Sequence, residues 1–143
     1  LNDIPKEPSM LGKANIAIEG KDITIVSYSN MVNVAKEAIA AEELQNYSIE
    51  LIDLQTVSPI DYDTIKTSLK KTKKLLVCQE APSNSSVGTT VISKIVESEL
   101  FQELEIAPKL VSGLHSPMPS AKHLELNVIP QVEDITNAVK SML

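Results

Sequence analysis

Two polar residues follow predicted strands of this chain and have side chains that could take part in ligand chemistry. Glu80 comes directly after the apolar segment Leu75 to Gln79, and His115 follows the segment Lys109 to Val111. Ligands of open parallel sheets bind outside the carboxyl ends of the strands, so Glu80 could line a cleft there. His115 could carry a proton, because an unperturbed imidazole titrates near roughly pH 6.5. For both residues we favour a structural alternative: Glu80 caps the following loop, and His115 is a surface or interface residue.

Cys78 and the pair Asp61 and Asp63 are the other candidates for chemistry. Cys78 lies in an apolar run with no base beside it, which favours a buried, inert thiol. Asp61 and Asp63 resemble paired carboxylates, but they stand where a helix should begin, and there we interpret them as capping residues. The four glycines are not spaced for a phosphate-binding loop, and the two histidines and one cysteine are too far apart in sequence to suggest a metal site. The residues alone therefore favour a binding, assembly or regulatory module.

Composition limits the class of protein and of partner. The 143 residues are 43% hydrophobic, enough for one domain with a core, and no apolar run approaches the roughly 20 residues that cross a bilayer. The net charge of −6 argues against a nucleic-acid surface. All thirteen basic residues are lysines, which disfavours a clamp for polyanions, because arginine binds phosphate and carboxylate groups bidentately. The single cysteine excludes an internal disulfide and fits a reducing compartment.

Strand and helix patterns alternate along most of the chain. The start, Leu1 to Pro5, has no initiator methionine, so we expect a fragment with a linker at 1–12 and one domain at 13–143. Apolar runs at Ala14 to Ile18 and Ile23 to Tyr28 predict a hairpin. The remaining predicted elements are helices at 30–44, 61–72, 87–101 and from Pro130 onward, with Ser29 or Asn30 capping the first, and strands at 48–54, 75–79 and 109–111. This order predicts a mostly parallel sheet that is covered on both faces, with one antiparallel strand at its edge.

A series of landmarks resembles one family over nearly the whole chain. The landmarks are Asp53 to Asp61, Lys70 to Lys74, Glu80-Ala81-Pro82, Pro117 to Lys122 and Ile129 to Val132. Together they resemble the C-terminal domain of the beta subunit of 2-oxo acid dehydrogenases. The Pro117 to Lys122 stretch is most similar to the pyruvate dehydrogenase type, whereas Glu80-Ala81-Pro82 looks more like the branched-chain type.

The resemblance implies a fold and an activity for the parent protein. The fold would be the transketolase C-terminal type, a three-layer α/β/α sandwich on a five-stranded, mostly parallel sheet with one antiparallel edge strand. The parent would catalyse oxidative decarboxylation of pyruvate and acyl transfer to lipoyl groups. In this family thiamine diphosphate and Mg²⁺ lie between the alpha subunit and the N-terminal domain of the beta subunit. We therefore expect this fragment to bind neither and to have no catalysis alone.

The resemblance also implies partners and partner-binding residues. The partners would be the alpha subunit and a second beta subunit, in an alpha2beta2 assembly, and the peripheral subunit-binding domain of the dihydrolipoyl acyltransferase. The candidate contacts are Glu105, the terminal carboxylate of Leu143, His115 and Glu80. Relatives of the pyruvate type carry an acidic residue directly before an Ala-Pro pair, where this chain has Ile106, so Glu105 would take over that contact. His115 and Gln55 stand where aspartate and arginine are usual.

Three alternatives stay open. The chain could belong to a branched-chain 2-oxo acid dehydrogenase, or to a transketolase or deoxyxylulose-phosphate synthase, although the lack of arginine argues against the latter two, which bind phosphorylated sugars. It could also be a stand-alone flavodoxin-like binding module, which the missing phosphate loop disfavours. For the leading interpretation the compartment would be the bacterial cytoplasm or, in a eukaryote, the mitochondrial matrix or a plastid.

Overall fold

The computed structural model describes residues 10–143, so most of the predicted linker at 1–12 lies outside the described residues. The strands are β1 (Asn15–Ile18), β2 (Ile23–Ser27), β3 (Ile49–Asp53), β4 (Leu75–Pro82) and β5 (Lys109–Gly113). The helices are α1 (Met31–Ala40), α2 (Tyr62–Thr72), α3 (Val87–Val96), α4 (Lys122–Glu125) and α5 (Val132–Lys140), with 3₁₀ turns η1 (Glu42–Leu44) and η2 (Glu99–Glu103). None of these helices has the length and apolar character needed to cross a membrane.

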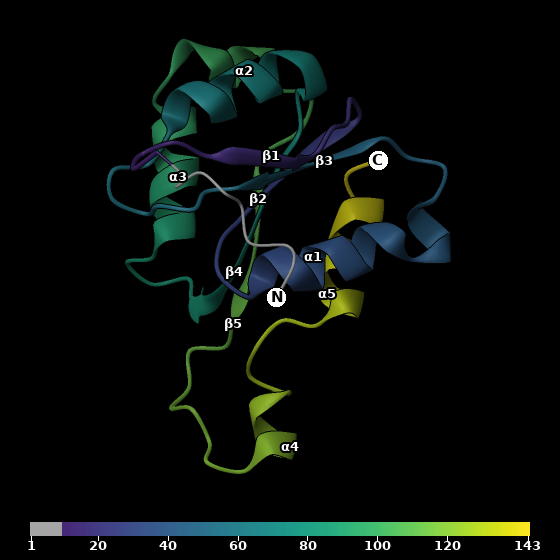
Figure 1. The fold of residues 1–143 in the computed structure, drawn as a ribbon, viewed down its shortest axis with the longest axis vertical. Helices are drawn as coiled ribbons and strands as arrows, with labels where there is room; N and C mark the ends of the chain where they lie inside the picture. Colours follow the sequence, from purple (N-terminus) through teal and green to yellow (C-terminus); the bar gives the residue numbers. More distant parts are fainter. Residues whose placement is uncertain (1–9) are drawn as a thin grey trace.

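The five strands form one sheet in the order β1-β3-β2-β4-β5. All neighbouring pairs are parallel except β1 and β3, so the predicted mostly parallel sheet with an antiparallel edge strand is confirmed. Helices cover both faces: α1 and α5 lie on one side of the sheet, and α2 and α3 on the other (Figure 1). The predicted three-layer α/β/α sandwich is therefore also confirmed.

The predicted hairpin is wrong, because β1 pairs with β3 and not with β2. All five residues of β2 are buried between β3 and β4, which leaves no edge of β2 for β1. The connection at 19–22 instead crosses the end of β3. There the amides of Lys21 and Asp22 donate to the Ser48 carbonyl, at 2.8 and 2.9 Å, and Gly20 packs so closely on the Ile49–Glu50 backbone that a Cβ would overlap it.

Two apolar cores fill the spaces on either side of the sheet. Alternation along the strands sends Ile25 toward α1 and α5 and the adjacent Val26 toward α2 and α3, as a pleated strand requires. Ile25 lies opposite Leu51 and Leu76 on the neighbouring strands, so each core contains matched rows of side chains. At about 25 cal/mol per Å² of apolar area, this burial is the main stabilising term of the fold.

Helix boundaries differ from the predicted ones mainly at the ends. The first and third helices stop at Ala40 and Val96, and η1 and η2 occupy the remainder of the predicted spans. The predicted cap of α1 is wrong: Asn30 has a helical backbone and no capping hydrogen bond. Pro130 was expected in the first turn of the last helix, but α5 begins at Val132, and Gln131 forms a capping box with Asp134. No pattern predicted α4.

One buried carboxylate lies at the amino end of the sheet. Glu50 on β3 is fully buried, forms an ion pair with Lys71 of α2, and accepts a hydrogen bond from Thr24 Oγ1 at 3.3 Å. Burial by itself raises the pKa of Glu50, but the hydrogen bond and charge of Lys71, together with hydrogen bonds from Ser68 and Gly20, outweigh it and hold that pKa below its usual range. The pair therefore joins β3 to α2 by a charged contact next to the apolar core.

Replacement of Lys71 by methionine should destabilise the domain, because it leaves the Glu50 carboxylate buried without its cation. We expect a loss of about 2 kcal/mol, below the ~3–5 of a fully buried pair because water screens Lys71. The measurement is urea unfolding of both proteins, with Lys70→Met as the matched control on the exposed side of the same helix turn. Equal stability of the two variants would contradict the role given to this ion pair.

Candidate partner-binding surfaces

The four predicted partner-binding residues lie at two different ends of the sheet. Glu80 and His115 are at the carboxyl end of the parallel strands, as the sequence predicted, because β4 and β5 end at Pro82 and Gly113. The predicted end of the strand at Gln79 is wrong, however, and Glu80 lies within β4. Glu105 and Leu143 lie at the opposite end, where the residues that precede β2 and β4 meet. The structure therefore brings these residues together in pairs and does not form one site from all four.

Glu105 and Leu143 line one shallow hollow. The amide of Glu105 donates to the Lys73 carbonyl at 3.0 Å, and its carboxylate is 3.8 Å from the Lys74 amine. The full lining is Lys21, Asp22, Tyr47, Lys71, Thr72, Lys73, Lys74, Glu105 and Leu143. Four lysines thus accompany the carboxylates of this hollow, which the sequence could not show because they come from separate segments. The surface has mixed charge and is not a purely acidic patch.

At the carboxyl end, Gln79 makes the loop contacts that we had assigned to Glu80. Its amide oxygen accepts from the Gly88 amide at 2.7 Å, and its amide nitrogen donates to the carbonyls of Ala81 and Pro82 at 2.9 and 3.1 Å. A Cβ on Gly88 would lie 2.6 Å from that oxygen, so a glycine is required for the approach. Glu80 itself is half-buried. The pKa of Tyr28 is raised mainly by the burial of the tyrosine and secondly by the negative charge of Glu80. A glutamine within an apolar strand, as Gln79 is in β4, is the sequence feature that indicates this role.

His115 is exposed, at the root of a segment that leaves the body of the domain. We call residues 114–130, which include α4, the projecting arm; Figure 1 shows it extending away from the sheet and from both helical layers. At its root the Leu114 amide donates to the Val128 carbonyl at 2.9 Å. Large apolar side chains of the arm are about half exposed, namely Leu114 (59%), Met118 (55%), Leu124 (46%) and Leu126 (48%). The arm therefore presents apolar surface of the kind that marks protein contacts.

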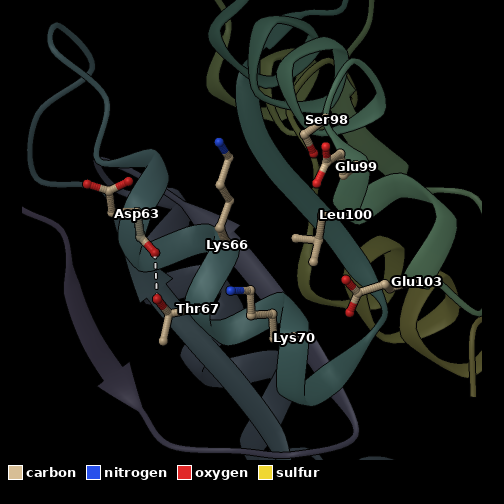
Figure 2. A pocket seen from close by; sticks show the side chains of 8 residues that line it. All are labelled: Asp63, Lys66, Thr67, Lys70, Ser98, Glu99, Leu100 and Glu103. Atoms are coloured by element: carbon tan, nitrogen blue, oxygen red, sulfur yellow. Dashed lines mark hydrogen bonds between the residues drawn. The ribbon is translucent and has the colours of Figure 1, made fainter.

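Figure 2 shows a second polar hollow, between α2 and η2. Lys66 and Lys70 of α2 lie across from Glu99 and Glu103 of η2, with Leu100 between the two elements. Opposite charges face each other across this hollow, and it holds no histidine or cysteine. Its lining offers hydrogen bonds to a partner but no nucleophile with an adjacent base.

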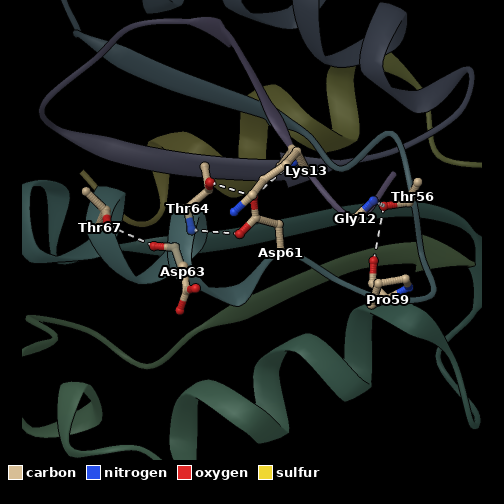
Figure 3. Close-up of polar contacts among 9 residues, drawn as sticks. Gly12, Lys13, Thr56, Pro59, Asp61, Asp63, Thr64 and Thr67 are labelled. Atoms are coloured by element: carbon tan, nitrogen blue, oxygen red, sulfur yellow. Dashed lines mark hydrogen bonds and ion pairs between the residues drawn. The ribbon is translucent and has the colours of Figure 1, made fainter. Parts of the chain in front are cut away.

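Asp61 caps α2 as predicted and also holds a distant segment. Its carboxylate accepts from the Thr64 amide at 3.2 Å and the Thr64 hydroxyl at 2.8 Å. It further accepts from the Ala14 amide at 3.1 Å and lies 3.7 Å from the Lys13 amine. Figure 3 shows these contacts converging on Asp61, whereas Asp63 points away from them. The two aspartates therefore do not act as a carboxylate pair, and the predicted capping role is confirmed for Asp61.

Cys78 and groups of metal ligands are the remaining candidates for chemistry among the described residues. Cys78 is fully buried, as predicted, and its burial raises the pKa of the thiol far above its usual range. Within residues 10–143, no three histidine, cysteine or acidic side chains are grouped as metal ligands. The Mg²⁺ of a thiamine diphosphate site is bound by oxygen ligands, and no acidic cluster of that kind lies among the described residues.

The sequence and the fold place the chain in a known family. Residues 12–135 match the family model of the transketolase C-terminal domain, and the chain belongs to this family. Curated relatives carry a more particular name, pyruvate dehydrogenase E1 component subunit beta. The protein of that name from Rickettsia bellii is 40% identical over 95% of this chain and 42% of its own length. The mitochondrial subunit beta-2 of Oryza sativa subsp. japonica is 38% identical over 91% of this chain and 34% of its own.

Solved structures support the same assignment of fold. A split-gene transketolase, described as an inactive beta4 tetramer, is 25% identical with a TM-score of 0.76, and the match covers 99% of this chain and 44% of that one. A 2-oxoglutarate:ferredoxin oxidoreductase from Magnetococcus marinus, 14% identical, shares the fold alone, with a TM-score of 0.59 over 91% of this chain and 19% of that one. The chain thus spans about two fifths of the curated relatives or less. The family resemblance that the landmarks predicted is confirmed.

The Asp61 contacts should make stability depend on pH in a defined direction. Burial alone raises the pKa of Asp61, but its hydrogen bonds from Ala14 and Thr64 outweigh this and lower that pKa. Its contribution is therefore fully present above an unfolded-state pKa of about 3.9 and is lost as the pH falls through the lowered folded value. Asp61→Asn should cost about 1–3 kcal/mol at neutral pH, and the difference from wild type should narrow below about pH 4.

Urea unfolding at a series of pH values measures this difference. Asp63→Asn, which removes the same charge from an exposed site in the same helix turn, is the control and should change stability little at any pH. A cost of Asp61→Asn that stays constant down to about pH 2.5 would show that the carboxylate charge does not stabilise the native state.

Proposed function

We propose that this chain is the C-terminal assembly domain of the beta subunit of a thiamine-diphosphate-dependent pyruvate dehydrogenase. The parent enzyme oxidatively decarboxylates pyruvate and transfers the acyl product to lipoyl groups, with thiamine diphosphate and Mg²⁺ held outside this domain. The supporting observation is the 36–40% identity to proteins named as pyruvate dehydrogenase beta subunits, over more than nine tenths of this chain. Those proteins come from bacteria and from plant mitochondria, so the proposed compartments are the cytoplasm or the mitochondrial matrix.

In this proposal the domain contributes to assembly with the alpha subunit and with a second beta subunit. The projecting arm supports an assembly role, because it extends beyond the body of the domain (Figure 1) and carries half-exposed leucine and methionine side chains. Taking a side chain of this size from full exposure to full burial contributes about 1.5–3 kcal/mol, so one that is already half covered contributes roughly half of that. Several of them together therefore supply much of the free energy of a stable subunit contact, without any charged group.

Substitution of two arm residues should dissociate the assembled enzyme. We expect Leu124→Ser with Leu126→Ser, made in the parent subunit, to weaken alpha2beta2 formation at least about tenfold, since two apolar contacts are lost. Co-expression with the alpha subunit followed by mass photometry measures the assembly, and pyruvate decarboxylation with thiamine diphosphate and Mg²⁺ measures the activity. Phe101→Ser, at a similarly exposed apolar residue of η2 (42%), is the control and should assemble normally. An assembled wild-type enzyme with no activity on pyruvate would refute the proposed function.

The second proposed partner is the peripheral subunit-binding domain of the dihydrolipoyl acyltransferase. Glu105 and the carboxylate of Leu143 would contact this basic module from their shared hollow, while His115 and Glu80 at the other end of the sheet would contact another subunit. Lys21, Lys71, Lys73 and Lys74 also line the hollow and reduce its negative potential. Docking there should therefore depend on specific pairs more than on long-range attraction.

Loss of the Glu105 charge and displacement of the terminal carboxylate should slow docking modestly. We expect Glu105→Gln combined with deletion of Leu143, which moves the terminal carboxylate back to Met142, to lower the association rate about two- to fivefold at low salt, with a smaller effect at high salt. Stopped-flow mixing of the assembled enzyme with the subunit-binding domain measures the rate. Glu103→Gln removes the same charge from the other hollow and should leave the rate unchanged. Equal rates for the double variant and this control would rule out docking at Glu105 and Leu143.

A further inference from the structure

The hollow between α2 and η2 is bordered by two walls of opposite charge. Lys66 and Lys70 of α2 form one wall, and Glu99 and Glu103 of η2 form the other (Figure 2). Asp63 also lines the hollow, but its side chain points away from η2. Within residues 10–143, none of the four charged groups of the walls takes part in an ion pair. The hollow therefore presents two lysines and two glutamates that do not neutralise each other.

Packing of the apolar core holds the two walls apart. Leu100, which is 5% exposed, lies between α2 and η2 and belongs to the same core cluster as Ile65 and Leu69 of α2. Beyond η2, the amide of Glu105 donates to the carbonyl of Lys73 at 3.0 Å, which ties the segment after η2 to the end of α2. Because a core side chain fills the space between the two elements, the separation of the walls is part of the fold.

The hollow has the size and the polar groups of a small-molecule site. Its volume is about 490 Å³, within the range of about 300–1,000 Å³ that such sites occupy. The hydroxyls of Thr67 and Ser98 also line it, and each donates to a backbone carbonyl, at 2.8 and 2.7 Å. A hydroxyl that donates in this way can still accept a hydrogen bond, so both oxygens can bind a donor on a ligand.

A ligand with a single charge gains little in this hollow. An anion that is attracted by Lys66 and Lys70 also faces the carboxylates of η2, and a cation meets the reverse arrangement. A molecule that carries both charges is attracted by both walls and is oriented by them. The charge pattern therefore selects a zwitterion over an anion or a cation of the same size.

We propose that this hollow binds a small zwitterion of the amino-acid class, with its carboxylate at Lys66 and Lys70 and its ammonium group at Glu99 and Glu103. The ion pairs are exposed to water and contribute little each, so the dissociation constant should be on the order of 1 mM. The site shares no lining residue with the hollow of Glu105 and Leu143 or with the projecting arm. The inference therefore goes beyond the proposed function and does not depend on it.

Amide NMR titration of the 143-residue chain tests the class of ligand. The probes are L-leucine and two relatives with one charge each: 4-methylpentanoate, which lacks the ammonium group, and 3-methylbutylamine, which lacks the carboxylate. At about pH 7, where these groups are charged, L-leucine should cause saturable shifts of the amide signals of residues 66–70 and 98–103. Each relative should bind at least about fivefold more weakly. No saturable shift with up to about 20 mM L-leucine, or equal binding of either relative, would overturn the proposal.

Reversal of the charges on the walls tests the site itself. Lys66→Glu with Lys70→Glu makes both walls acidic and should weaken L-leucine binding at least about tenfold. Addition of Glu99→Lys and Glu103→Lys restores two opposite walls in reversed order, and binding should recover to within about threefold of wild type. A fourfold variant that gives the spectrum of a folded chain but does not recover binding would overturn the proposal.

The matched control removes an ion pair from outside the hollow. Lys94 and Glu97 of the α3 region pair at 2.9 Å and do not line the hollow, so Lys94→Met with Glu97→Gln should bind L-leucine as wild type does. Equal weakening in this control and in the variant with two acidic walls would show that the hollow is not the site. Neither titration requires activity on pyruvate, so these outcomes are separate from those that test the proposed function.

Discussion

The rest of the structure depends on the burial of β2 between two parallel neighbours. Every residue of this strand is buried, and its two polar side chains are satisfied inside: the Ser27 hydroxyl donates to the Cys78 carbonyl at 3.0 Å, and Thr24 bonds Glu50 and Thr72. Because β2 has no free edge, β1 must pass to the outside of β3, and the helices must divide between the two faces. The position of β2 therefore determines both the division of the helices into two layers and the antiparallel pairing of β1 with β3.

The same constraint gives one polar side chain at each end of the sheet a structural role. At the amino end Glu50 forms an ion pair with Lys71. At the carboxyl end the side-chain amide of Gln79 is hydrogen-bonded to the backbone of Gly88, Ala81 and Pro82. A carboxylate or amide whose hydrogen bonds are all made within the fold stabilises the fold and is not available to a substrate. Contacts with other subunits are then left to groups other than these two, namely those of the hollow that Glu105 and Leu143 line and those of the projecting arm. This division fits a domain whose contribution to an enzyme is assembly.

Local patterns predicted what local forces determine. The bounds of α2 followed from Pro59, the cap at Asp61 and the apolar spacing of Ile65 and Leu69, all of which lie within one helix. The hairpin prediction was wrong because β1 and β2 are both short apolar segments, and the sequence does not show that each pairs with β3. Likewise, nothing near Glu105 or Leu143 indicates that four lysines from separate segments share their hollow. Long-range pairing is the part that a single sequence leaves open, because it depends on loop closure and packing across the whole chain.

Two of the three departures that the family resemblance predicts fall where packing does not constrain the residue. Gln55 and His115 are both exposed, and Gln55 lies in a turn with a φ of +53°, where its amide donates to Asp53 Oδ1 at 3.0 Å. Ile106, by contrast, packs against the core, whereas Glu105 beside it is exposed. A core residue is held by its neighbours in the same chain, whereas an exposed one is held only by a partner. Exchanges at Gln55 and His115 therefore alter the surface of this domain and leave its packing unchanged.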